Sequence, residues 1–325
     1  MALIKGDASN NTLTGTDLAD AIHGFSGNDI LHGEGGDDRL TGNFGDDTLF
    51  GGAGNDVLEG GHGRDRLIAD QGDDELYGGE GHDTLITYGG RTSLIAGGGD
   101  DRMMIKGTGD FFATGETGYD TLILNLEEIA SDPNSAFQNT SHRSSYFDFI
   151  LKKEGIGFEL HARDFEKLIV NCAGGSDVMN GSDVEDWLIG QGGHDFLRGW
   201  LGNDLLKGGR GRDHLVGDEG NDTLRGGANK DQLDGGAGDD TLHGGAGADV
   251  FIFDVAGDGT DQILDFEIGV DKIQITPDYY DFDQLSFSQE TGFVEITFDD
   301  DRDATEIQVM NVTLAELDNA ANFIF

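Results

Sequence analysis

Hydrophobic and polar residues recur along this chain in a frame of nine residues. The frame holds for twelve steps over residues 6–113 and, after a lapse, for nine more over residues 172–252. The sixth place is Asp in 19 of the 21 steps, with Asn11 and Thr92 as the exceptions, and the eighth place is apolar in all 21. A period this strict predicts a stack of nearly identical units.

Each step divides into a turn and a short strand. The first six places read Gly-Gly-x-Gly-x-Asp, and so many glycines exclude a helix and suit turn conformations that only glycine adopts at low cost. The last three places read x-Leu-x and should alternate outward, inward, outward. Two steps therefore form one 18-residue coil, and stacked coils form two parallel sheets that enclose the eighth-place residues. The inward residues include Leu31, Leu40, Leu49, Leu58, Leu67, Leu76 and Leu85 in the first run, and Leu188, Leu197, Leu206, Leu215, Leu224, Leu233 and Leu242 in the second.

The predicted fold class is all-β, with two parallel β-roll blocks separated by a β-rich insert and followed by a C-terminal β cap. The predicted parts are a first roll at 1–113, an insert at 114–171, a second roll at 172–252 and a cap at 253–325. The insert contains short apolar runs typical of strands, and about 58 residues is small for an independent catalytic domain. The cap is predicted to contain strands and one short helix that begins after Thr313.

Composition narrows the classes of partner. Lys and Arg total 20 and Asp and Glu total 64 among 325 residues, which gives a formal charge of −44. This much acid argues against nucleic acid or an anionic membrane as the partner. No apolar run approaches transmembrane length, and residues 1–6 do not resemble a cleavable signal peptide. Cys172 is the single cysteine, so no intrachain disulfide is expected.

The regular Asp creates an electrostatic problem that a cation would solve. Stacking places each sixth-place Asp about 5 Å from the Asp 18 residues further on. At an effective dielectric constant near 20, such a pair repels by about 3 kcal/mol, so a few pairs would cancel the roughly 5–15 kcal/mol net stability of a domain. Calcium suits the gap, because it accepts roughly six to eight oxygens from carboxylates and backbone carbonyls. No Cys or His recurs at a fixed place, which disfavours zinc and softer metals.

The predicted calcium ligands are the sixth-place carboxylates and the carbonyl oxygens of the glycine turns. One ion per stacked Asp pair sets a ceiling of about 14 Ca²⁺ ions. The carboxylates are those of Asp20, Asp29, Asp38, Asp47, Asp56, Asp65, Asp74, Asp83, Asp101, Asp177, Asp186, Asp195, Asp204, Asp213, Asp222, Asp231, Asp240 and Asp249. The carbonyls are those of Gly33, Gly35, Gly42, Gly51, Gly52, Gly54, Gly60, Gly63, Gly199, Gly208, Gly211, Gly217, Gly226, Gly235, Gly238, Gly244 and Gly247.

The nonapeptide closely resembles the calcium-binding repeat of the RTX (repeats-in-toxin) hemolysin-type family. The resemblance extends into the tail, where 247–254, 257–266 and 269–273 are similar to the segment that closes the roll in secreted RTX enzymes. Residues 312–325 resemble the uncleaved type I secretion signal of that family. The resemblance implies a protein that is secreted by a type I apparatus and is extracellular or associated with the cell surface.

Three functional classes fit the sequence. The first is a secreted calcium-binding protein with a structural, adhesive or surface-binding role, whose further partner would be a cell-surface polysaccharide or another secreted protein. The second is an extracellular enzyme acting on polysaccharide or by hydrolysis, with its site on the insert or a roll face. The third is a secretion and folding module for a toxin or enzyme partner. The first class is favoured because no zinc-protease helix and no nucleophile elbow occurs. His142 and His161, the two His outside the repeats, could join Asp148 or Asp164 in an enzymatic site, but nothing in their spacing demands it.

Overall fold

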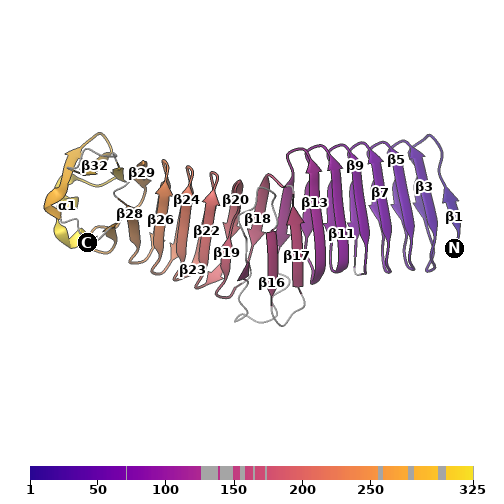
Figure 1. The fold of residues 1–325 in the computed structure, drawn as a ribbon, viewed down its shortest axis with the longest axis horizontal. Coiled ribbons are helices and arrows are strands. Elements are labelled where there is room, and N and C mark those ends of the chain that lie inside the picture. Colours follow the sequence, from indigo (N-terminus) through magenta and orange to yellow (C-terminus); the bar gives the residue numbers. More distant parts are fainter. Residues whose placement is uncertain are drawn as a thin grey trace. The chain divides into compact units, whose positions relative to one another are not determined.

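A computed structural model describes residues 1–70, 72–125, 138–139, 149–153, 158–163, 165–172, 174–254, 259–276, 282–298 and 305–324. The described residues fall into two compact units, one up to residue 170 and the other from residue 171 onward. Each unit is built from short strands that stand side by side, as Figure 1 shows. The three boundaries between the four predicted parts stay predictions.

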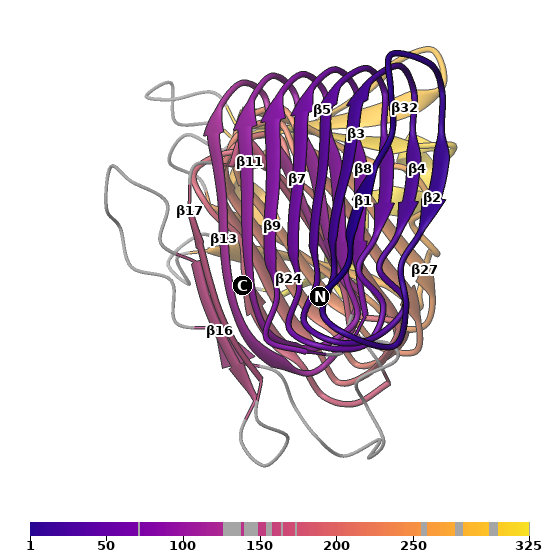
Figure 2. The same cartoon turned by 90° about the vertical axis from the view of Figure 1, so that its right-hand side faces the viewer.

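Unit 1 consists of two parallel sheets whose strands alternate along the chain, so that each coil contributes one strand to each sheet (Figure 2). The first sheet holds β1 (Leu3–Lys5), β3 (Ala21–Ser26), β5 (Arg39–Phe44), β7 (Val57–His62), β9 (Glu75–Glu80), β11 (Gly90–Gly98), β13 (Gly109–Thr117) and β17 (Phe158–Arg163). The second holds β2 (Thr12–Thr14), β4 (Ile30–His32), β6 (Thr48–Phe50), β8 (Arg66–Ala69), β10 (Thr84–Thr87), β12 (Arg102–Ile105) and β14 (Thr121–Asn125).

The predicted insert adds both parallel and antiparallel strands to unit 1. Parallel stacking continues past residue 113, because β17 pairs with β13 in parallel. Two further strands are antiparallel, since β16 (Phe149–Lys153) pairs with β17 and β15 (Gln138–Asn139) pairs with β16. The chain then forms β18 (Lys167–Asn171), where the second unit begins.

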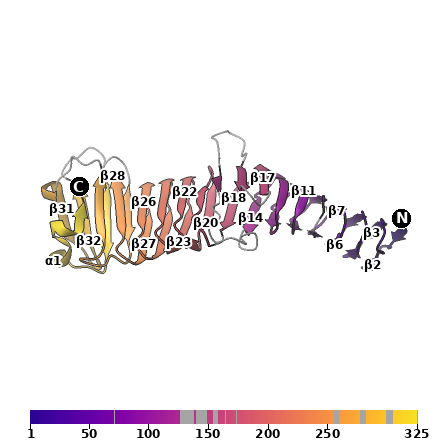
Figure 3. The ribbon, with the colours of Figure 1, turned by 90° about the horizontal axis from the view of Figure 1, so that it is seen from below.

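Unit 2 repeats the same two-sheet design, seen from below in Figure 3. One sheet holds β19 (Val178–Asn180), β22 (Phe196–Leu201), β24 (His214–Glu219), β26 (Gln232–Ala237), β28 (Val250–Asp254), β30 (Lys272–Thr276) and β34 (Phe323–Ile324). The other holds β20 (Glu185–Ile189), β21 (Gly192–Gly193), β23 (Leu205–Gly211), β25 (Thr223–Ala228), β27 (Thr241–Ala246), β29 (Thr260–Ile263), β33 (Glu306–Met310), β32 (Phe293–Phe298) and β31 (Leu285–Gln289). The last three of these pair antiparallel to one another.

The core of each unit is a column of eighth-place side chains. Strand partners differ by 18 residues, so Leu40 pairs with Leu58 and Leu206 with Leu224. Each of the fourteen leucines predicted to point inward has an exposed fraction of 0%. The structure therefore confirms the all-β parallel β-roll and the inward face of the repeat.

The predicted frame is wrong in its last step of the first run. Between β11 and β13 the partner offset grows from 18 to 19 residues, because Thr92 pairs with Phe111. Phe111 is consequently buried at 2% exposure, whereas Phe112, the predicted inward residue, is 39% exposed. One extra residue enters in the turn at Gly107, where a Cβ would collide with the carbonyl of Tyr88.

Short helical turns and strands close unit 2 at its C-terminal end. The predicted helix is α1 (Leu314–Leu317), and Thr313 and Glu316 form the expected capping box. Two 3₁₀ turns, η1 (Phe282–Gln284) and η2 (Ala320–Asn322), precede β31 and β34. None of the helices in the described ranges is long and apolar enough to cross a membrane.

Candidate calcium centre

The sixth-place Asp side chains form continuous hydrogen-bonded columns along the turns of each unit. The backbone N–H of one Asp donates to Oδ1 of the Asp in the next coil, at 2.6–2.9 Å, and the series that begins at Asp20 ends at Asp74, where the next coil presents Thr92. The link from Asp29 to Asp47 to Asp65 is one example. This bond fixes the carboxylate and consumes one of its two oxygens, so the orientation of the second oxygen is set by the stack.

The second oxygen of these carboxylates is buried without a partner. Each of these Asp residues is at most 3% exposed. Within the described part of the chain, Oδ2 accepts no hydrogen bond in Asp29, Asp38, Asp47, Asp56, Asp65, Asp74, Asp83, Asp101, Asp120, Asp195, Asp204, Asp213, Asp222, Asp231 and Asp249. A buried carboxylate oxygen with no donor is costly, and its regular recurrence indicates a site for a cation.

The first-place glycines show that each orphan oxygen faces a small space lined by oxygen atoms. A Cβ built on Gly60 would lie 2.5 Å from Oδ2 of Asp65 and 2.7 Å from the carbonyl oxygen of Gly78. A Cβ on Gly226 would lie 2.6 Å from Oδ2 of Asp231 and 2.7 Å from the carbonyl oxygen of Gly244. At Gly60 and Gly226 the absence of a side chain leaves this space open, whereas Ala69, Thr87, Ala96, Ile105 and Cys172 occupy the first place in other steps.

Burial makes the columns electrostatically unfavourable when they carry their full charge. Burial, together with the negative charges of Asp186, Asp222 and Glu185, raises the pKa of Asp204 to about 9. Burial and the charges of Asp83 and Asp47 raise the pKa of Asp65 to about 7. Without metal, Asp204 and Asp65 therefore either repel their neighbours or take up a proton near neutral pH.

Asp20, at the start of its column, differs from these residues in the direction of its pKa shift. The backbone N–H of Ala2 and the hydroxyl and N–H of Thr16 all donate to its carboxylate. These donors lower the pKa of Asp20 below its ordinary value. The predicted ligand at this position is therefore already satisfied by hydrogen bonds, unlike those further along.

The oxygen donors present in the turns fit calcium. Carboxylates and backbone carbonyls are the ligands that this ion prefers. The described residues contain no group of three or more His, Cys, Asp or Glu side chains placed to share one metal ion. Side chains alone would thus be too few, and the backbone carbonyls of the turns would have to complete each site.

The structure places the predicted carbonyls in two groups. First-place carbonyls lie beside the orphan Oδ2 of the preceding coil at Gly42, Gly51, Gly60, Gly208, Gly217, Gly235 and Gly244. The carbonyls of Gly33 and Gly199 lie beside Oδ2 of Asp20 and Asp186, which accept hydrogen bonds from Thr16 and Ser182. Carbonyls of fourth-place glycines instead lie against the next coil's backbone, as seen for Gly54, Gly63 and Gly238. Both assignments as calcium ligands stay predictions.

Three Asp residues continue the columns beyond the predicted set. Asp101 donates to Asp120, Asp240 to Asp261 and Asp249 to Asp271, across 19, 21 and 22 residues. Each new Asp lies in a Gly-x-Asp-x-apolar fragment, beginning at Gly118, Gly259 and Gly269. The fragment retains the fourth, sixth and eighth places, so this signal was available in the sequence even though the period had changed.

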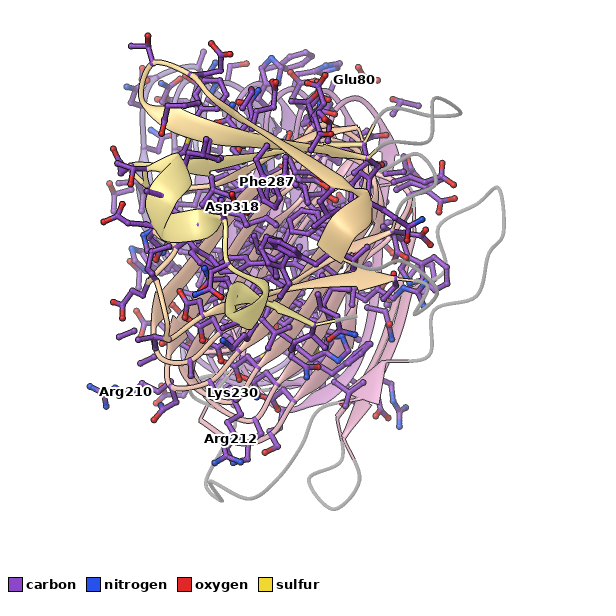
Figure 4. All side chains as sticks on the ribbon, turned by 90° about the vertical axis from the view of Figure 1, so that its left-hand side faces the viewer. Glu80, Arg210, Arg212, Lys230, Phe287 and Asp318 are labelled. Atoms are coloured by element: carbon purple, nitrogen blue, oxygen red, sulfur yellow. The ribbon has the colours of Figure 1, made fainter. Side chains whose placement is uncertain are left out.

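A second side-chain ladder runs beside the Asp columns at the fifth place, with opposite polarity. The N–H of Asp46 donates to Oδ1 of Asn28 in the preceding coil, and the N–H of Arg64 donates to Asp46. His194 accepts in the same way from the N–H of Arg212. Arg212 and Lys230, labelled in Figure 4, have no acceptor atom, so they cannot extend this ladder. The sequence did not reveal this fifth-place ladder because its acceptor side chains vary among Asn, Asp, His and Ser.

The residues proposed for an enzymatic site are mostly beyond what the structure describes. His142, Asp148 and Asp164 lie outside the described residues, and for His161 only the backbone of β17 is described.

Comparison with known families identifies the repeat. The family of the RTX calcium-binding nonapeptide repeat (4 copies) matches overlapping windows that together cover residues 5–104 and 173–254, more than half of the chain. The chain belongs to this family. RTX repeats bind calcium, and proteins that carry them are typically secreted. No curated protein matches the chain.

Solved structures that match the chain include a lipase and two subunits of an epimerase. The extracellular lipase LipA from Serratia marcescens is 16% identical over 89% of this chain, with a TM-score of 0.29, and this chain covers 45% of the lipase. The AlgE6R2 subunit of the Azotobacter vinelandii mannuronan C5-epimerase is 27% identical over 45% of this chain and 91% of that one, with a TM-score of 0.27. The AlgE6R3 subunit of that epimerase is 25% identical over 46% and 78%, with a TM-score of 0.18.

Proposed function

We propose that this chain is a secreted calcium-binding protein whose β-rolls fold when calcium binds outside the cell, and that the folded rolls have a structural, adhesive or surface-binding role. The observation that carries the proposal is the series of buried Asp oxygens without a hydrogen-bond donor in the described coils. Hydrogen bonding within the protein satisfies one oxygen of each carboxylate and leaves the other oriented toward a carbonyl of the next coil.

The ligands in this proposal are the sixth-place carboxylates and the turn carbonyls. Bound calcium would supply the positive charge that the Asp columns lack. The three additional pairs, Asp101/Asp120, Asp240/Asp261 and Asp249/Asp271, would add to the ceiling of about 14 ions predicted from the sequence. Because the stack and the sites form together, the energy of ion binding becomes folding energy.

The same coupling suits export. In a cytosol with little calcium, mutual repulsion of the Asp residues would keep the chain extended, in a form suited to a type I apparatus. The C-terminal segment that resembles a secretion signal is folded into unit 2 once the stack exists. Phe323 is 7% exposed and Asn322 is 2% exposed, and the Asn322 amide donates to the carbonyls of Glu316 and Leu317. We expect this segment to be accessible only before folding.

A calcium titration followed by circular dichroism tests the proposal. In excess chelator the full chain should lack most of its β signal, and added calcium should restore it cooperatively. Magnesium at the same concentration should restore little, because it requires shorter bonds and nearly ideal octahedral geometry. A full β signal in chelator would contradict the proposal.

A further inference from the structure

A groove crosses the outer face of the first sheet of unit 1, from β5 to β13. Its volume is about 680 Å³. Second-place glycines Gly61, Gly79 and Gly97 form the floor, each with a positive φ between 108° and 117°. A Cβ on Gly79 would lie closer than 3.0 Å to the carbonyl oxygen of Gly61. The floor therefore lacks side chains at these three glycines, whereas Asn43 and Glu116, which align with them at the two ends, carry side chains.

Two rows of side chains make the walls of this groove. One wall consists of ninth-place residues, one per coil, and includes Glu59, Tyr77 and Ile95. The other wall consists of third-place residues and includes Phe44 and Glu80. Five neighbouring strands at about 4.8 Å spacing give a length of about 19 Å, which accommodates several units of a linear polymer.

Two aromatic residues line the groove, Phe44 on the strand at one end and the half-buried Tyr77 on the middle strand. Phe44 is 58% exposed and stacks on His62, with ring centroids 5.0 Å apart and planes 9° apart. Tyr77 lies on the facing wall, with its hydroxyl donating to Glu75 at 2.9 Å. Rigid aromatic faces of this kind bind the apolar faces of pyranose rings at low entropic cost.

The charge of the groove is negative. Glu59, Glu80 and Glu116 line it, and none of its lining residues is Lys or Arg. Arg39 lies beside it and pairs with Glu59 at 2.5 Å, which leaves Glu80 and Glu116 as the exposed acids for a ligand. This acidic lining favours a positively charged ligand and disfavours a polyuronate.

The backbone of the floor disfavours an extended peptide. The strands β7, β9 and β11 each pair with a strand on both sides. The groove thus offers no open sheet edge to which a peptide strand could add. A ligand must instead contact side chains only, through rings and charged groups.

We propose that this groove binds a linear amino polysaccharide, a chain of pyranose rings that carry primary ammonium groups. The rings contact Phe44 and Tyr77, and the ammonium groups pair with Glu80 and Glu116. This inference rests on the proposed function, since it names the partner of a surface-binding role, and it requires the calcium-folded chain.

Isothermal titration calorimetry of the full chain in calcium tests the groove, with a β-1,4-linked glucosamine hexamer as the probe. Binding should weaken with salt, since exposed charges are screened. Replacing Glu80 with Gln, or Glu116 with Gln, should weaken binding by about three- to fivefold each, as expected for an exposed ion pair. Tyr77→Ala should weaken it by at least as much. Glu34→Gln is the matched control, because Glu34 is exposed in the same unit and lies outside the groove.

Competing outcomes are separated by the choice of probes. The N-acetylated hexamer and a mannuronate hexamer should bind at least tenfold more weakly than the glucosamine hexamer. Equal binding of all three, or equal affinity of E80Q, E116Q and the native chain, would overturn the proposal. Binding of oligolysine that depends on Glu80, without binding of the sugar, would assign the groove to a basic peptide. Circular dichroism in calcium distinguishes a wrong groove proposal from a wrong proposed function. The first would leave the β signal intact, whereas the second would appear as loss of the fold.

Discussion

At the scale of single residues, adjacent Asp residues in one turn have opposite roles. Asp47, in the sixth place, is 1% exposed and its Oδ2 has no donor among the described residues. Asp46, in the fifth place, is exposed and accepts the N–H of Arg64. An Asn performs the fifth-place role equally well, as Asn28 shows. Charge is therefore required at one position and dispensable at its neighbour.

Replacing Asp47 with Asn should lower calcium affinity and raise the stability of the metal-free chain. The amide oxygen can still accept the N–H of Asp29, while the negative charge is lost. In calcium we expect the concentration for half-folding to rise by about tenfold, because charge count tunes affinity. In chelator the variant should show more β structure than the native chain, since burial raises the pKa of Asp47 to about 6. Asp46→Asn should change neither the calcium concentration for half-folding nor the β structure in chelator, both measured by circular dichroism. Changes equal to those of Asp47→Asn would contradict the different roles of the two positions.

The first-place glycine gives a second residue-scale prediction. Gly60→Ala would place a Cβ 2.5 Å from Oδ2 of Asp65 and 2.7 Å from the carbonyl oxygen of Gly78. In calcium this should lower the free energy of unfolding by about 1–3 kcal/mol, as overpacking does. Gly35→Ala is the control, because its Cβ would meet nothing closer than 3.6 Å and should be neutral or stabilising by about 0.4–1 kcal/mol. Urea unfolding in saturating calcium measures the free energy of unfolding of both variants. An equal loss of stability in the two would show that crowding of Oδ2 of Asp65 is not the cause.

At the scale of elements, the sequence predicts what repeats and fails where the spacing changes. The nine-residue period predicts the two sheets, the buried leucines and the Asp columns correctly. It misplaces Phe112 and misses Asp120, because one extra residue near Gly107 moves both out of frame. Stacking tolerates this slip, since the coil realigns its Asp and apolar residues and absorbs the extra residue in a turn. A period defined along the chain cannot show such a realignment in space.

The closing strand β34 yields an element-scale prediction. Phe323 packs against Phe282 and Phe287, with ring centroids 5.3 and 5.8 Å away. Phe323→Ala should destabilise unit 2 in calcium by about 3 kcal/mol, the lower end for a buried Phe. Ile324→Ala is the matched control, because its side chain is 38% exposed and should cost less than about 1 kcal/mol. Thermal unfolding in calcium compares the two, and equal destabilisation would show that β34 does not close the core through Phe323.

At the scale of the whole molecule, the proposed function requires a chain that is soluble without calcium and stable with it. The net charge of −44 keeps the unfolded chain extended. Folding buries many of these charges in columns instead of distributing them over the surface. If calcium fills the columns as proposed, ion concentration controls whether the chain is folded. The groove in unit 1 belongs to the folded form only, since its floor and walls come from five different coils.

The buried columns determine how stability should depend on pH without metal. Burial and neighbouring charges raise the pKa of Asp65 and Asp231 to about 7 and that of Asp204 to about 9, against an ordinary value of 3.8. The folded metal-free chain therefore binds more protons than the unfolded chain between pH 3.8 and these values. The stabilisation is fully present below the ordinary pKa and is lost as pH rises through the folded pKa values.

In chelator we therefore expect β structure to appear on acidification toward about pH 5 and to disappear toward about pH 9. In calcium the trend should reverse, because protons compete with the ion for the same oxygens. Repulsion among exposed charges would produce a similar metal-free trend, but about 1 M KCl screens exposed charges far more than buried ones. Circular dichroism across this pH range, with and without KCl, separates the two causes. A metal-free transition that survives high salt supports the columns, whereas one that vanishes there assigns the pH dependence to the surface.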